Sequence, residues 1–177
     1  MAVRMEELRD HEAVRAVNRA AFGGGHGETV AELVAALRRD DPGALSLVAE
    51  EDGEVVGHIM FSRTLLDAPR ELVPVQTLSP LGILPQWQGR GLGTALIRAG
   101  LDEMGERGVP LVFLEGDPRY YSRSGFEPAA GLGFRKPSLR IPDAAFQVFR
   151  LPAYETWMTG TLVYSDTFWR YDCVGLR

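Results

Sequence analysis

The sequence has 177 residues, 45% hydrophobic and 24% charged, as expected for a single globular domain spanning residues 1–177. Its net charge of −5 argues against a nucleic-acid-binding protein, and no apolar stretch reaches the length of a transmembrane helix. The single cysteine, Cys173, excludes an internal disulfide and a zinc site built from cysteine pairs. Because the N-terminus is too charged for a signal peptide, we expect a cytoplasmic protein that does not bind membranes.

The N-terminal part is predicted to contain a short strand and two helices. Residues 2–8 alternate weakly between apolar and polar side chains, which favours a strand. Asp10 is suited to cap the helix that follows, since aspartate accepts from the free N–H groups of a first turn. Residues 23–27 contain four glycines, so we expect a mobile loop there. A second helix is predicted over about 28–39.

Three strands are predicted next. The stretches 45–50 and 55–66 are rich in β-branched and aromatic residues and flank an Asp-Gly pair, which is a strong signal for a hairpin. The stretch 72–83 has a similar pattern but contains Pro74 and Pro80. Since proline donates no backbone hydrogen bond, this strand is expected to be interrupted or partly at an edge of the sheet.

A glycine-rich turn joins this last strand to a helix predicted over about 92–106. Its glycines, Gly89, Gly91 and Gly93, let the backbone approach an anion, and the first turn of a helix presents free N–H groups to it. The spacing fits neither a Walker A loop, which ends in Gly-Lys-Ser/Thr, nor the G-x-G-x-x-G dinucleotide fingerprint. A turn that binds no ligand is the alternative.

Two motifs point to one family. Gln88, Gly91 and Gly93 form the pattern Q-x-x-G-x-G, which resembles the signature loop of the GCN5-related N-acetyltransferases (the GNAT superfamily), and the stretch 83–85 supplies the V/I-x-P element expected just before it. The stretch 120–126, YYSRSGF, resembles a second GNAT motif at a similar distance beyond the loop. The resemblance covers roughly residues 45–127, although the usual Asn and Ala before the tyrosines are absent.

The resemblance implies an α/β (α+β) fold with a mixed, mostly antiparallel central sheet flanked by helices. It implies acetyl-CoA as cosubstrate and no metal ion. In such proteins the backbone after a bulge in the strand aligns the pantetheine arm, here Leu81 and Ile83. The residues implied to hold the pyrophosphate are Gln88, Gly89, Arg90, Gly91, Leu92, Gly93 and Thr94. The Arg90 side chain either adds a contact to phosphate or is solvated.

Tyr121 matches the tyrosine that, in this family, protonates the departing coenzyme A thiolate. A phenol can lend its proton to a neighbouring thiolate, but a tyrosine that only packs is the alternative, and Tyr120 is the expected core residue of the pair. No general base can be identified from the sequence. Glu28, Glu50, His58 and Glu115 are candidates, with His58 read more simply as a satisfied histidine in a strand, and a water chain could replace a dedicated base.

The C-terminal part is predicted from local patterns. Residues 111–114 form a continuous apolar run typical of a buried strand, parallel to the strand before the glycine-rich turn. Asp117 followed by Pro118 predicts the start of a short helix. The stretches 146–151 and 161–168 are expected to form an extended C-terminal β-hairpin that completes the sheet.

These observations predict an acetyl-CoA-dependent N-acetyltransferase. It would transfer the acetyl group directly to a primary amine in a ternary complex, because Cys173 is poorly placed for a covalent route. The expected acceptor is a small-molecule or peptide amine, and a homodimer is possible through the C-terminal hairpin. A non-catalytic acyl-CoA-binding or sensing protein of the same fold is the alternative.

Overall fold

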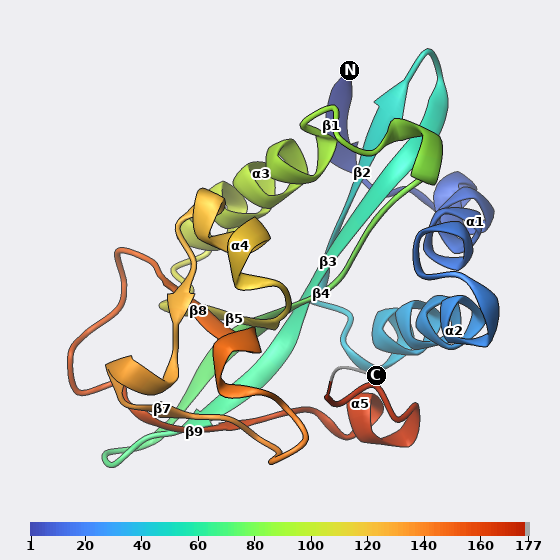
Figure 1. Cartoon of the computed structure of the whole chain (residues 1–177). Coiled ribbons are helices and arrows are strands. Elements are labelled where there is room, and N and C mark those ends of the chain that lie inside the picture. Colours follow the sequence, from blue (N-terminus) through green and yellow to red (C-terminus); the bar gives the residue numbers. More distant parts are fainter. Residues whose placement is uncertain (176–177) are drawn as a thin grey trace. The chain divides into compact units, whose positions relative to one another are not determined.

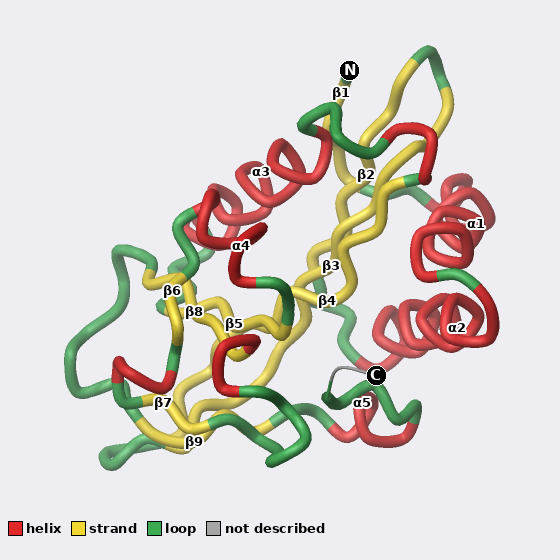
Figure 2. Tube along the Cα trace, in the orientation of Figure 1, coloured by secondary structure: helices red, strands yellow, loops and turns green. Residues whose placement is uncertain are grey.

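A computed structural model describes residues 1–175 (Figure 1). The fold is mixed α/β, with a mostly antiparallel open sheet flanked by helices (Figure 2). The chain divides into two compact units, which are described separately: the first combines Met1–Ser62 with Leu78–Gly100, and the second combines Arg63–Thr77 with the chain from Leu101 onward. Within residues 1–175, no helix is long and apolar enough to cross a membrane.

The first unit contains two complete strands, two complete α-helices, two short 3-10 helices and parts of three longer elements. They are β1 (Ala2–Met5), the short 3-10 helix η1 (Leu8–Asp10), α1 (His11–Phe22), α2 (Gly24–Asp40), β2 (Leu45–Glu51), most of β3 (Glu54–Asp67), the end of β4 (Leu72–Ile83), the 3-10 helix η2 (Pro85–Trp87) and most of α3 (Leu92–Glu106).

The second unit holds the remaining parts of β3, β4 and α3 and the C-terminal elements. These are β5 (Leu111–Glu115), α4 (Pro118–Tyr121), η3 (Ser122–Ser124), β6 (Glu127–Pro128), η4 (Ala130–Leu132), β7 (Phe134–Arg135), η5 (Asp143–Ala145), β8 (Phe146–Arg150), β9 (Gly160–Val163) and α5 (Asp166–Arg170).

The sheet of the first unit is antiparallel, with β2 paired to β1 on one side and to β3 on the other. The predicted hairpin is confirmed: β2 and β3 are joined by Asp52 and Gly53, whose φ angles of 49° and 82° suit the tight turns that the twist of a hairpin favours. Val48 and Ile59, which lie on opposite faces of the sheet, are both fully buried and form part of the core.

Two expectations for the N-terminal part were wrong. Residues 23–27 are not a mobile loop, because Gly23 alone links α1 to α2 and the next glycines belong to the first turn of α2. A Cβ at Gly27 would lie 2.4 Å from the carbonyl oxygen of Arg19, so the two helices approach too closely there for any other residue. Asp10 precedes α1, but its side chain makes no cap and bonds instead to Arg4 and to the Glu7 N–H.

Helix α3 spans Leu92–Glu106, as predicted, and packs closely on the sheet within the first unit. A Cβ at Gly100 would lie 2.2 Å from the ring of Phe61, so glycine sets this close approach. Strand β4 has the predicted bounds but is more regular than its two prolines indicate. It runs without interruption from Leu72 to Ile83 through both prolines, with a cis peptide bond before Pro80. The expected interruption of this strand was therefore wrong.

In the second unit, β5 is the buried parallel strand that the sequence predicts. It pairs with β4 in parallel, with Gln76 opposite Val112 and Thr77 opposite Phe113, and with β8 in antiparallel orientation. The Phe113 ring lies in the core, edge-on to Phe134 at 5.1 Å.

The expected C-terminal hairpin is absent from the described chain. Strand β8 pairs with β5 and β6, whereas β9 pairs with β3 and β7. The stretch 161–168 also stops being a strand at Val163, because α5 begins at Asp166 directly after Ser165. Tyr164 and Phe168 are both buried and their rings are 5.1 Å apart, so these aromatic residues serve the packing of α5 and not an alternating strand.

Candidate functional site

The glycine-rich turn lies at the end of β4 in the first unit. The Leu84 N–H still bonds to the Val56 carbonyl at 2.9 Å, so the strand holds its register up to the turn. Gly89 and Gly91 have φ angles of 74° and 82°, which only glycine adopts without strain. No heavy atom lies within 4 Å of a Cβ built at either position, so space above the turn is open.

Helix α3 begins immediately after this turn. Its first backbone hydrogen bond joins the Ala95 N–H to the Gly91 carbonyl at 3.0 Å. The N–H groups of Leu92, Gly93 and Thr94 precede that bond and have no carbonyl partner within the helix. They add to the positive end of the helix dipole, which favours an anion at this point.

Two side chains of the turn have local roles. The Gln88 side-chain amide donates to the Ile83 carbonyl at 3.1 Å and so ties the turn to the end of β4. The Arg90 guanidinium is exposed and lies over the Trp87 ring, 4.6 Å from its centroid. The backbone N–H groups are therefore the main groups of the turn that are available to an anion.

Leu81 and Ile83 lie on one face of β4 and Gly82 on the other. The Ile83 side chain lies against Gly57 of β3, where a Cβ would come within 2.7 Å of it. On the opposite face, a Cβ at Gly82 would lie 3.0 Å from Asn18 Oδ1 of α1. Leu81 and Ile83 are half-buried, so the strand end is not sealed into the core.

Tyr121 is the last residue of α4 in the second unit, whereas the glycine-rich turn belongs to the first. The short helix is capped as predicted, since the Asp117 side chain accepts from the Arg119 N–H at 2.9 Å. The Tyr121 ring packs against Gly116, where a Cβ would lie 2.3 Å from it, and burial raises the pKa of its phenol. Tyr120 is 37% exposed, so the expectation that it is the core residue of the pair was wrong.

Two of the four general-base candidates are held by arginine. Glu28 forms ion pairs with Arg15 and Arg19, and the hydrogen bond from Arg19 is the main cause that lowers the pKa of this carboxyl. Glu50 accepts from Arg4 at 2.7 Å. An arginine partner stabilises the ionised carboxylate and makes it a weaker base.

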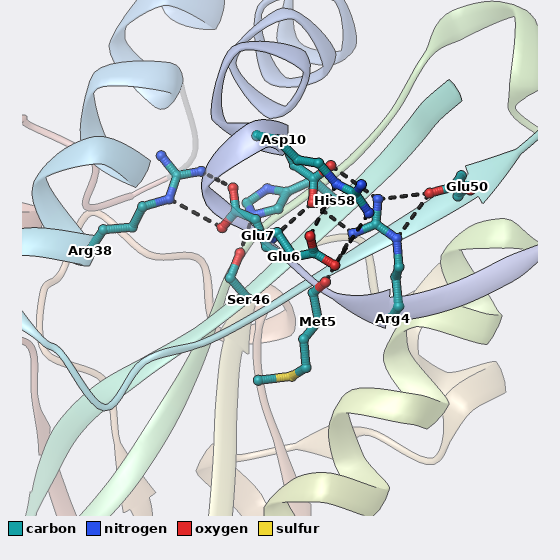
Figure 3. A network of polar contacts seen from close by, with 10 residues as sticks. Arg4, Met5, Glu6, Glu7, Asp10, Arg38, Ser46, Glu50 and His58 are labelled. Carbon is teal, nitrogen blue, oxygen red and sulfur yellow. Dashed lines mark hydrogen bonds and ion pairs between the residues drawn. The ribbon is translucent and has the colours of Figure 1, made fainter. Parts of the chain in front are cut away.

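His58 is completely buried inside the first unit (Figure 3). Its Nδ1 lies 3.0 Å from the Asn18 side-chain nitrogen, and its Nε2 lies 2.9 Å from the Ser46 hydroxyl. Asn18 donates its other hydrogen to the Val14 carbonyl, which fixes the orientation of the amide. Burial, with a smaller contribution from the Arg38 charge, lowers the pKa of His58 to about 3. The reading of His58 as a satisfied histidine is therefore the one that its contacts support.

The same unit contains a charged cluster that the sequence did not reveal. Arg4 donates to Asp10 at 2.7 Å and to Glu50 at 2.7 Å, and the hydrogen bond from Arg4 lowers the pKa of Asp10 to about 2 (Figure 3). The cluster borders a pocket of about 670 Å³ that reaches Leu84. None of the residues predicted to bind the cofactor lines this pocket.

Glu115 is the candidate that differs from the others. It ends β5 in the second unit and is half-buried. Its Oε2 accepts from the Tyr164 hydroxyl at 3.0 Å, and its Oε1 accepts from the Gly175 N–H at 2.8 Å. Burial raises the pKa of Glu115, and these two hydrogen bonds and the Arg140 charge offset part of that rise. No local sequence signal identifies these partners, because they lie 49 and 60 residues away.

Cys173 is half-buried and its thiol donates to the Tyr171 carbonyl at 3.4 Å. Within residues 1–175, no group of three or more His, Cys, Asp or Glu side chains is arranged to hold a metal ion.

Comparison with known proteins identifies the family. The sequence profile of the Acetyltransferase (GNAT) family matches residues 11–126. The Escherichia coli N-acetyltransferase YjhQ is 36% identical over 163 residues, which cover 89% of this chain and 88% of YjhQ. The E. coli N-acetyltransferase YhbS is 35% identical over 175 residues, which cover 97% of this chain and all of YhbS.

Two solved structures are similar over nearly the whole chain. The crystal structure of E. coli YhbS in complex with CoA has a TM-score of 0.83 at 34% identity and covers 94% of this chain and 91% of its own. A GNAT family acetyltransferase from Brucella melitensis in complex with acetyl-CoA has a TM-score of 0.74, also at 34% identity, and covers 94% of this chain and 97% of its own. With its fold and signature motifs, the chain belongs to the GNAT family of acetyltransferases.

Proposed function

We propose that this protein transfers the acetyl group of acetyl-CoA to a primary amine, directly and within a ternary complex. The observation that carries the proposal is the open turn before α3, where consecutive backbone N–H groups at a helix N-terminus are free to hold a pyrophosphate. The two similar structures that contain CoA and acetyl-CoA support this choice of cosubstrate.

In this proposal the two ends of the cosubstrate meet different parts of one continuous segment. The backbone of Leu81 and Ile83 aligns the pantetheine arm, and an N–H group of that strand polarises the thioester carbonyl as an oxyanion site does. The pyrophosphate-binding residues are Gln88, Gly89, Arg90, Gly91, Leu92, Gly93 and Thr94. Gln88 acts through its hydrogen bond to the Ile83 carbonyl, which couples the geometry of the two ends.

Tyr121 is the proposed acid that protonates the departing thiolate. A phenol has an ordinary pKa near 10, and burial raises the pKa of Tyr121 further, so its hydroxyl stays protonated at neutral pH, as a proton donor must. The proposed acceptor is a small-molecule or peptide amine, and the proposed location is the cytoplasm, where acetyl-CoA is available. A homodimer remains a prediction, although the C-terminal hairpin through which it was expected to form is absent from the described chain.

Thermal melting with and without acetyl-CoA tests the cosubstrate. A ligand at a hundred times its dissociation constant adds about 2.7 kcal/mol to the free energy of unfolding. For a chain of this size we expect the melting temperature to rise by roughly 5–10 °C. ATP and NAD serve as controls, and a shift with either of them but not with acetyl-CoA would contradict the proposed use of the turn.

Replacement of Tyr121 by phenylalanine tests catalysis. We expect turnover with acetyl-CoA and a panel of primary amines to fall about 100-fold, since general acid catalysis contributes on that order. The melting shift with acetyl-CoA should be unchanged, because the ring remains. Tyr154→Phe, at a half-buried tyrosine of the same unit, is the matched control.

Two other outcomes have distinct meanings. Unchanged turnover in Tyr121→Phe would show that the Tyr121 side chain only packs and does not act as the acid. If the wild-type protein binds acetyl-CoA but acetylates no amine in a broad panel, the sensing function replaces the proposed one.

A further inference from the structure

The carboxylates of the second unit differ in their partners. Six of them are held by a cation, in the pairs Glu103–Arg107, Asp117–Arg119, Glu127–Arg150, Asp143–Lys136, Asp166–Arg170 and Asp172–Arg140. Glu115 instead accepts from two uncharged donors, the Tyr164 hydroxyl and the Gly175 N–H. A cation partner lowers the proton affinity of a carboxylate, whereas uncharged donors in a partly buried site leave it higher.

The surroundings of Glu115 favour proton binding. The Tyr164 side chain that donates to it is buried and packs against Phe168, and burial raises the pKa of Glu115. The charge of Arg140 acts on it, and Arg140 is itself paired with Asp172 at 3.0 Å. The residue as a whole is half-buried and is not sealed into the core.

Glu115 is one residue away from the part of β5's end that contacts Tyr121. It precedes Gly116, and the Tyr121 ring packs directly against Gly116. In a direct transfer, the amine nitrogen and the sulfur are bonded to the same carbon in the intermediate. The group that takes a proton from nitrogen and the group that gives one to sulfur must therefore lie near each other.

The remaining candidates do not meet these requirements. Glu28 and Glu50 are held by arginines. His58 has both ring nitrogens within hydrogen-bond distance of Asn18 and Ser46 and is fully buried, so it is not accessible to an amine.

We propose that Glu115 is the general base of the acetyl transfer and takes the proton of the acceptor ammonium group, with Tyr164 and Gly175 holding its carboxylate in place. This inference rests on the proposed function. The neutral amine then attacks the thioester carbon, a C–N bond forms, and the C–S bond breaks as the thiolate takes the Tyr121 proton. The tyrosinate recovers a proton from the new amide nitrogen, and Glu115 releases the ammonium proton to solvent.

Replacement of Glu115 by glutamine tests the proposal, with the amine that the wild type acetylates fastest as the probe. We expect kcat/KM at pH 7 to fall about 100-fold. The acidic limb set by Glu115 in the wild-type pH profile should be replaced by a rise at higher pH that follows the pKa of the amine, because solution then supplies the neutral amine. The melting shift with acetyl-CoA should equal that of the wild type. Glu127→Gln, which changes an exposed carboxylate of the same unit, should leave the profile unchanged.

Replacement of Tyr164 by phenylalanine keeps the carboxylate and gives an independent readout if Glu115→Gln fails to fold. The Tyr164 hydrogen bond lowers the pKa of Glu115, so its loss should move the acidic limb to higher pH. A carboxylate that only anchors the C-terminal segment would not shift this limb.

The outcomes separate this inference from the function on which it rests. If the wild type acetylates an amine and Glu115→Gln does so within threefold of the same rate and with the same profile, Glu115 is not the base. An acidic limb that stays in place in Tyr164→Phe leads to the same conclusion. A wild type that acetylates no amine contradicts the proposed function, and this inference with it.

Discussion

The glycine-rich turn and the Glu115 cluster, which consists of Glu115, Tyr164 and Gly175, are built in opposite ways. The turn is a contiguous segment, residues 88–94, in which backbone N–H groups carry the proposed function and Gln88 fixes the segment to a carbonyl only five residues away. The Glu115 cluster is made of a side chain and donors from segments 49 and 60 residues away. A backbone site is encoded locally by the spacing of glycines, whereas a side-chain site exists only after distant segments have packed together.

Gly91→Ala is the strongest test of whether the glycine-rich turn binds acetyl-CoA through its backbone. At a φ angle of 82°, a Cβ costs about 1–2 kcal/mol, so we expect the turn to relax and its N–H groups to leave the anion-binding arrangement. Acetyl-CoA should bind about 100-fold more weakly, a loss of about 2.7 kcal/mol, measured by calorimetric titration.

Gly53→Ala is the matched control for this change. Gly53 has the same φ angle, 82°, and equally open surroundings, but lies in the β2–β3 turn. We expect comparable destabilisation with unchanged acetyl-CoA affinity. Equal affinity losses in both variants would mean that strain, and not the position of the turn, weakens binding.

The same contrast explains which features were predictable. The bounds of α3 and the β2–β3 hairpin follow from glycine spacing and local periodicity, and both were confirmed. The role of Gly27 was not predictable from the sequence. It depends on the Arg19 carbonyl oxygen of the neighbouring helix, which would lie 2.4 Å from a Cβ at this position. The C-terminal stretch was misread because Tyr164 and Phe168 have the apolar pattern of a strand but are used to pack a short helix.

Site residues divide in the same way. The turn and Tyr121 were predicted as site residues from motifs, and the secondary structure around them agrees with the predicted strand, turn and helices. The choice among four base candidates required contacts: two arginines on Glu28, one on Glu50, and complete burial of His58. Ion pairing and burial depend on tertiary packing, so a single sequence does not determine them.

His58 is also held by partners that are distant in sequence, but we expect these contacts to affect the stability of the fold and not the reaction. Its pKa of about 3 lies below the ordinary value of 6.5, so between these values the unfolded chain binds a proton that the folded chain does not. The free energy of unfolding should therefore fall as pH falls, by roughly 1.4 kcal/mol per pH unit.

The matching variant is His58→Gln, measured by urea unfolding at pH 7 and pH 5. Glutamine does not titrate, so this variant should lose most of the wild-type decrease between the two values, while its melting shift with acetyl-CoA at pH 7 stays the same. Equal decreases in both proteins would mean that His58 is protonated in the folded state or that other groups set the acid stability.

Arg90→Ala, the variant with the smallest expected effect, tests whether the turn binds acetyl-CoA mainly through its backbone N–H groups. Arg90 is the only cation within residues 88–94, and its exposed side chain lies over Trp87. If backbone N–H groups hold the pyrophosphate, Arg90→Ala should weaken acetyl-CoA binding only about threefold to fivefold, which corresponds to less than 1 kcal/mol. The loss should shrink as salt is raised, because salt screens an exposed charge.

Arg98→Ala, which removes an exposed charge from α3, is the control for net charge and should leave acetyl-CoA binding nearly unchanged. A loss in Arg90→Ala as large as that in Gly91→Ala would make the guanidinium the main phosphate ligand. Both sites would then be side-chain sites, and the contrast between the turn and the Glu115 cluster would fail.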